Sequence, residues 1–84
     1  WRRGRSSLED AVVQLVKLRQ RASQVRSAAE LRQLEPDLEQ LSLRIGQALA
    51  SGAASDKSAT SALLALDLTE RALERTRQRV SASG

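Results

Sequence analysis

The amino-acid sequence predicts an all-α protein, a small up-down-up bundle of three helices. Ala, Leu, Arg, Gln and Glu dominate the 84 residues, and all five are strong helix formers. Three stretches carry aliphatic residues at alternating steps of three and four, the spacing of one buried helix face. Val, Ile and Thr together contribute only nine residues and form no alternating run, so no strand is predicted. Short connections between the stretches favour antiparallel neighbours.

The first helix is expected over about residues 7–26, after a basic linker at residues 1–5. Ser6 and Glu9 have the spacing of a capping box, which marks a helix start. The aliphatic stripe of this helix consists of Leu8, Ala11, Leu15, Leu18, Ala22 and Val25.

The second helix is expected over about residues 28–50. Its stripe does not continue the phase of the first, and Ser27 with Glu30 repeats the capping-box spacing at the phase break. Pro36 then falls inside the helix and is expected to kink or split it. Alternatively, the first helix runs on to Leu34 and the second begins at Pro36; the phase break favours the former. The stripe consists of Leu31, Leu34, Leu38, Leu41, Ile45 and Ala48.

The third helix is expected over about residues 57–80. A turn of small residues around Gly52 precedes it, and Asp56 lies in its cap region. The helical domain therefore covers residues 6–80, and residues 81–84 form a C-terminal tail. The third stripe consists of Ala59, Ala62, Leu66, Thr69, Leu73, Thr76 and Val80.

The composition excludes much of the usual chemistry of active sites. The chain has no Cys and no His, so it lacks thiolate nucleophiles, imidazole bases and the usual zinc ligands. Its single aromatic residue, Trp1, provides no platform for base stacking. Glycine-rich phosphate loops and nucleophile motifs are also absent. We therefore expect a protein that is not an enzyme and that uses no metal or cofactor.

Aliphatic residues outside the three stripes are the first candidates for function. A core wider than a narrow seam accounts for Val12, Leu49 and Leu63. Leu64, however, points nearly opposite the buried stripe of its helix, with Leu68 beside it. Such a pair indicates a surface for a partner or for self-association.

Two arginines, Arg71 and Arg75, lie beside this pair and complete the predicted partner-binding residues. An exposed aliphatic surface flanked by Arg suits a partner helix or an acidic segment. Because the chain starts at Trp1 rather than at Met, we expect it to be a piece of a larger protein. The sequence thus favours a cytoplasmic adaptor or scaffold domain that binds another protein or itself.

The basic residues suggest an alternative, an anion-binding or nucleic-acid-binding module. Parallel first and third helices would bring their C-terminal ends together. The ordinary preference of cations for helix C-termini also accounts for this pattern, and a net charge of +4 is weak electrostatics for DNA. The candidate patch consists of Arg19, Arg21, Arg26, Arg77 and Arg79.

The first five residues suggest a third interpretation. Trp followed by clustered Arg is typical of the cytoplasmic side of a membrane helix, so residues 1–5 predict membrane proximity and a juxtamembrane cytoplasmic domain. The chain itself contains no run of about 18 apolar residues that could span a bilayer.

Overall fold

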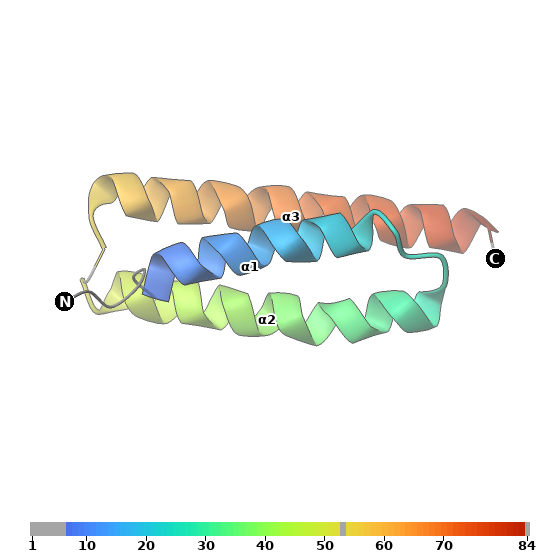
Figure 1. Cartoon of the computed structure of the whole chain (residues 1–84), viewed down its shortest axis with the longest axis horizontal. Coiled ribbons are helices and arrows are strands. Elements are labelled where there is room, and N and C mark those ends of the chain that lie inside the picture. Colours follow the sequence, from blue (N-terminus) through green and yellow to red (C-terminus); the bar gives the residue numbers. More distant parts are fainter. Residues whose placement is uncertain (1–6, 53, 84) are drawn as a thin grey trace.

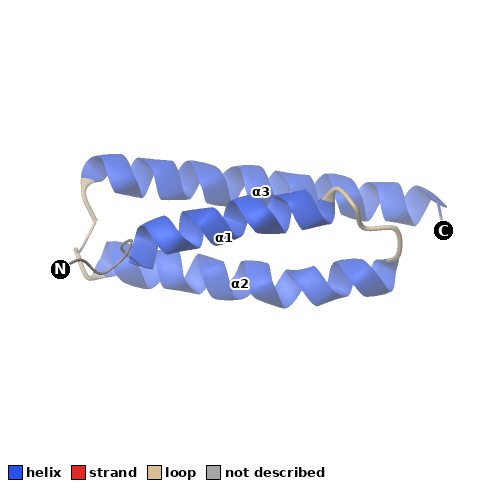
Figure 2. Cartoon of the chain, viewed as in Figure 1, coloured by secondary structure: helices blue, strands red, loops and turns tan. Residues whose placement is uncertain are grey.

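The computed structural model describes residues 7–52 and 54–83, which form three α-helices. They are α1 (Ser7–Ala22), α2 (Ala28–Ala50) and α3 (Asp56–Ser83). No strand occurs in the described residues (Figure 2), so the prediction of an all-α chain with three helices is confirmed. None of the described helices is both long and apolar enough to cross a membrane. The predicted linker at residues 1–5 and the Ser6 cap lie outside the described residues.

Each helix packs against the other two (Figure 1). The register of α1 against α3 follows from two hydroxyls. Thr69 on α3 donates to the Leu15 carbonyl oxygen, and Thr76 donates to that of Ala22. Both acceptors lie 54 positions earlier in the chain, so α1 and α3 run parallel with a constant offset. In Figure 1, α1 runs from left to right and α2, below it, runs from right to left.

The core lies along the common axis of the three helices and is almost entirely aliphatic. Leu15, Ile45 and Leu73 are its largest fully buried aliphatic side chains, and Thr69 and Thr76 are its buried polar residues. All residues of the three predicted stripes are buried or half-buried, which confirms the stripes as the inner faces of the helices.

The connection between α1 and α2 begins earlier than the sequence predicts, because α1 ends at Ala22 rather than near residue 26. The Ser27 side chain accepts from the Glu30 N–H at 3.2 Å, which confirms the predicted capping box of α2. The Glu30 carboxylate in turn accepts from the N–H groups of Arg26 at 2.7 Å and Ser27 at 3.2 Å. Residues 26 and 27 therefore belong to the cap of α2, and the chain must reverse before them. The alternative of one long first helix is wrong.

The C-terminal end of α1 is covered by α3. Arg79 donates to the Val25 carbonyl oxygen at 2.8 Å and to that of Ala22 at 3.3 Å. These bonds satisfy carbonyl groups that a helix end leaves without intrahelical partners. Val25 itself is buried although it lies beyond α1. The C-terminal turns of α3 thus fix the point at which α1 stops.

Two further helix ends complete the fold. α2 is a single helix that contains Pro36, and it ends as predicted, before Gly52, whose φ of 73° suits glycine. α3 continues to Ser83, three residues beyond the predicted end and into the predicted tail. The chain has no Gly or Pro between residues 53 and 83, so nothing stops the helix earlier.

Candidate interaction face between α1 and α3

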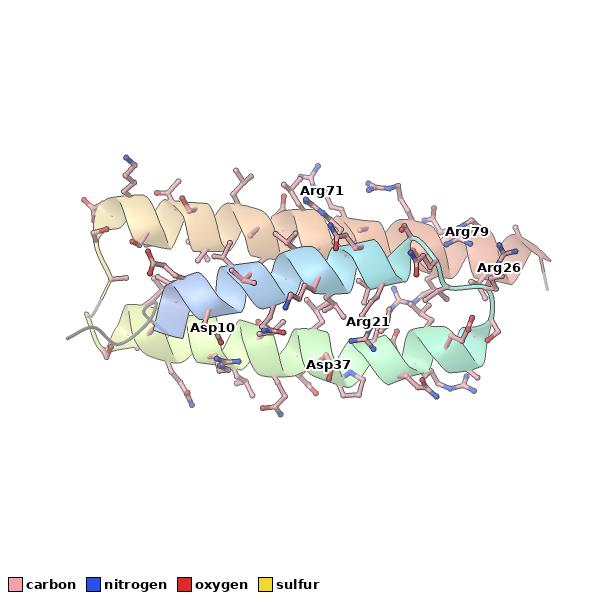
Figure 3. All side chains as sticks on the ribbon, viewed as in Figure 1. Asp10, Arg21, Arg26, Asp37, Arg71 and Arg79 are labelled. Atoms are coloured by element: carbon pink, nitrogen blue, oxygen red, sulfur yellow. The ribbon has the colours of Figure 1, made fainter. Side chains whose placement is uncertain are left out.

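Ion pairs hold the outer edges of α2 against its neighbours. Arg21 on α1 pairs with Asp37 on α2 at 3.4 Å, as Figure 3 shows, and Arg44 on α2 pairs with Asp10 on α1 at 3.2 Å.

On the other side of α2, Glu35 pairs with Arg77 of α3, which also pairs with Glu74. The hydrogen bond to Glu35, opposed in part by desolvation and assisted by Glu74, raises the pKa of Arg77 above its ordinary value. This guanidinium therefore stays charged and paired with the carboxylates of Glu35 and Glu74.

The contact between α1 and α3 is built differently. Between residues that the structure describes, no ion pair joins these two helices. Hydrogen bonds join them instead. The hydroxyls of Thr69 and Thr76 and the guanidinium of Arg79 donate these bonds to backbone carbonyl oxygens. The ion pairs at the edges of α2 therefore have no counterpart between α1 and α3 among the described residues.

Two hollows lie along the outer side of this contact. One, near the N-terminal ends of α1 and α3, is lined by residues that include Val12 and Ser61. The other, near their C-terminal ends, is an open hollow of about 640 Å³, where Ala72 lies among polar and basic side chains. Between the hollows, Val16 follows Val12 by one turn and Leu68 precedes Ala72 by one turn. We call the two hollows and the surface between them the α1/α3 groove.

The rim of the groove is aliphatic in its middle. Val16 and Leu68 are each 39% exposed. The constant offset of 54 places Leu68 level with position 14 of α1, close to the level of Val16. The two side chains therefore stand on opposite sides of the groove at nearly the same height.

The predicted partner-binding residues lie in one stripe on the outer side of α3. Leu64, Leu68, Arg71 and Arg75 follow one another at steps of four, three and four, which is the repeat of a helix face. Leu64 is 57% exposed, so it lies outside the core as its phase predicts. Arg71 pairs with Asp67 of its own helix at 3.0 Å, whereas Arg75 lines the α1/α3 groove.

The expectation that Leu63 belongs to the core is wrong, because this side chain is 49% exposed. It follows the buried Ala62 and is therefore rotated by about 100° around α3, which carries it off the inner face. Val12 and Leu49 do pack against the core as expected.

The structure divides the predicted basic patch. Arg21 and Arg77 pair with carboxylates of α2, and Arg26 lies in a separate hollow that Arg77 and Val80 also line. Arg19 and Arg79 remain, and they line the C-terminal hollow of the groove together with Arg75. We call Arg19, Arg75 and Arg79 the arginine cluster. No carboxylate of the described residues pairs with Arg19 or Arg75.

The positive character of this cluster is local. Three of the 14 basic residues are at positions 2, 3 and 5, so residues 6–84 carry 11 basic and 10 acidic side chains. The hollow between α2 and α3 has the opposite balance, with two arginines against three glutamates. The helical part of the chain is thus nearly neutral, and its charge is separated between two faces.

Among the described residues, no group of three or more acidic side chains is placed to hold a metal ion. Comparisons with protein-family models, with curated proteins and with solved structures give no match to this chain. The α1/α3 groove and the outer stripe of α3 are therefore the candidate interaction surfaces of this chain.

Proposed function

We propose that this chain is an up-down-up three-helix bundle, bent at Pro36, and a non-enzymatic interaction domain of a larger cytoplasmic protein. It binds a partner helix or an acidic segment through Leu64 and Leu68, with Arg71 and Arg75 beside them. The observation that carries the proposal is the exposure of Leu64 and Leu68 on a helix whose inner face is already filled by its own stripe.

Burial of the aliphatic stripe supplies the free energy of binding in this proposal. Removing apolar surface from water contributes roughly 25 cal/mol per Å². The stripe from Leu64 to Arg75 extends over about 17 Å, or three turns, which suits contact with another helix. The arginines steer an acidic partner and fix its register rather than supply most of the affinity.

Leu43 provides a matched control for Leu64. Its side chain is 55% exposed, but it lies on α2. We suggest selecting helical peptides from a displayed random library on the 84-residue chain and then testing them on Leu64→Asp and Leu43→Asp. Selected peptides should be amphipathic and acidic. They should lose binding to Leu64→Asp and keep binding to Leu43→Asp.

Circular dichroism and melting temperature decide whether this result concerns the surface or the fold. Both variants should keep the helicity and melting temperature of the parent chain, because both side chains are exposed. If Leu64→Asp unfolds the chain, Leu64 belongs to the core and the proposal fails. Sedimentation at two protein concentrations tests whether the partner is a second copy.

An anion-binding or nucleic-acid-binding module is the second candidate function. The observation in its favour is the arginine cluster, where Arg19 and Arg75 have no carboxylate partner among the described residues. Binding to phosphates should weaken steeply between about 50 mM and about 200 mM salt, whereas an aliphatic interface should respond little. A juxtamembrane position would depend on residues 1–5, which lie outside the described residues.

A further inference from the structure

We infer that the α1/α3 groove binds a partner helix that runs antiparallel to α1 and α3 and carries acidic side chains in its first turn. This inference rests on the proposed function and specifies the partner's chemistry and direction.

The three grooves of the bundle differ in what a docked helix would have to cover. The groove between α1 and α2 contains the Arg21–Asp37 and Arg44–Asp10 pairs. The groove between α2 and α3 is lined mostly by charged side chains. A helix docked over these charges would have to remove their water. The free-energy cost of this desolvation exceeds the gain from new contacts unless those contacts pair the charges well. The α1/α3 groove also has charged side chains in its two end hollows, but no ion pair crosses it between described residues, and its middle presents the exposed aliphatic side chains Val16 and Leu68.

The aliphatic part of the α1/α3 groove suits the apolar face of a helix. Val12 and Val16 stand on one side, and Leu68 stands on the other with Leu64 on the crest above it. Ala72 continues the α3 side toward the arginine cluster with a side chain that lets another helix approach closely. A helix of about four turns would match α1, which has 16 residues.

The charge of the groove indicates which end of the bound helix should be acidic. The arginine cluster lies at one end of the groove, where α1 terminates, and Arg19 and Arg75 have no carboxylate partner among the described residues. Carboxylates of an occupant that reach this end would form charge-assisted hydrogen bonds with the guanidinium groups. The other end of the groove holds one acidic and one basic side chain, Glu9 and Lys57, and therefore offers carboxylates no comparable excess of positive charge.

The helix dipoles of α1 and α3 indicate the chain direction of the bound helix. Because Ala22 is level with Thr76, both α1 and α3 point their C-terminal ends toward the arginine cluster. An antiparallel occupant brings its positive N-terminal end there, beside the negative end of α1. Acidic residues also stabilise the first turn of their own helix, whereas the same residues in a last turn would destabilise it. An acidic first turn next to the arginine cluster satisfies both requirements.

Two synthetic peptides of about 16 residues, the length of α1, test the charge requirement. Both carry Leu at alternating steps of three and four, and they differ only in a first turn with three Glu or with three Lys. Fluorescence anisotropy measures their binding to the 84-residue chain. The Glu peptide should bind the parent chain roughly tenfold more tightly than the Lys peptide, and Arg75→Glu should reverse this preference. Arg32→Glu is the matched control, because Arg32 is exposed in the groove between α2 and α3.

A nitroxide on the first residue of the Glu peptide tests the direction. In the antiparallel arrangement it broadens the amide resonances of residues 19–23 and 75–79. Broadening of residues 8–12 and 57–61 instead would overturn the inferred direction.

The remaining outcomes separate this inference from the proposed function. If both peptides bind equally and Leu64→Asp abolishes their binding, the charge assignment is wrong while the interaction function stands. If neither peptide binds, the inference is overturned, and the peptide selection decides the function separately. If neither peptide binds but an RNA oligonucleotide does, and Arg75→Glu abolishes RNA binding while Arg32→Glu keeps it, the cluster serves a nucleic acid and the inference fails.

Discussion

The contact between α1 and α3 and the contacts of α2 join the same helices by different chemistry. The ion pairs of α2 lie at its edges, between side chains that retain 38–56% of their exposure. The bonds from Thr69 and Thr76 lie inside the bundle, where both residues are at most 4% exposed. An exposed ion pair contributes about 0–1 kcal/mol and weakens with salt, whereas a buried hydroxyl bond contributes about 0.5–1.5 kcal/mol.

This difference distinguishes the face that we propose for a partner from the other two. Where ion pairs join two helices, the paired charges at the edge already have partners. Where buried hydroxyls join them, the edge keeps its aliphatic side chains and two arginines without carboxylate partners among the described residues. The α1/α3 contact thus stabilises the fold from the inside, and its outer side is the face that we propose for recognition.

The largest change in the free energy of unfolding is expected when the inner and outer faces of α3 are compared. Leu73→Ala removes a side chain that is 2% exposed and should lower the free energy of unfolding by about 2–5 kcal/mol. Leu64→Ala should change it by less than about 0.5 kcal/mol, because Leu64 is on the outer side. Urea denaturation measures both values. Comparable losses would show that α3 has no free face and would break the comparison.

The next effect concerns the two hydroxyls. Thr76→Val should cost about 0.5–1.5 kcal/mol, because it removes a donor 3.1 Å from the Ala22 carbonyl oxygen at the end of α1. Thr69→Val should cost less, since its oxygen lies farther from its acceptor on α1, at 3.4 Å from the Leu15 carbonyl oxygen. Both hydroxyls also lie within hydrogen-bond distance of a carbonyl oxygen of α3, that of Ala65 at 2.8 Å and that of Ala72 at 2.9 Å. Urea denaturation at low and high salt should give the same loss. A loss that disappears with salt would contradict the buried character of these bonds.

Local patterns in the sequence were enough to predict the helices and the exposure of Leu64. The period of about 3.6 residues identifies inner faces, and the Ser27–Glu30 spacing locates the start of α2. Leu63 was assigned wrongly because a periodic pattern gives the centre of a buried face but not its width.

The end of α1 and the division of the arginines could not be predicted in the same way. Arg79 reaches Ala22 across 57 positions, and Arg77 reaches Glu35 across 42. These contacts depend on the register of packed helices, which no local pattern contains. With the offset of 54 known, the grouping of Arg19 with Arg75 follows directly, because position 19 of α1 is level with position 73 of α3.

A smaller change in stability tests whether α2 opens more readily than the other two helices. Gly46 lies inside α2, and a Cβ added there would meet nothing within 4 Å. Gly46→Ala should raise the free energy of unfolding by about 0.4–1 kcal/mol and slow amide hydrogen exchange in α2 more than in α3. Gly52→Ala is the control, and it should lower stability because φ is 73° there. If hydrogen exchange in all three helices slows equally, the chain opens as one unit and α2 is not distinct.

The smallest effect is expected from the ion pairs themselves. Asp10 and Arg44 lie 3.2 Å apart, and their side chains are 42% and 41% exposed. A double-mutant cycle with Asp10→Asn and Arg44→Gln should give a coupling of about 0.2–1 kcal/mol, which high salt removes. Such a value means that Leu41 and Ile45 hold α2 in the bundle, and that the ion pairs only set its edge. A coupling above about 2 kcal/mol that persists at high salt would mean that ion pairs, rather than aliphatic packing, hold α2 in the bundle. The contrast between the two kinds of helix contact would then fail.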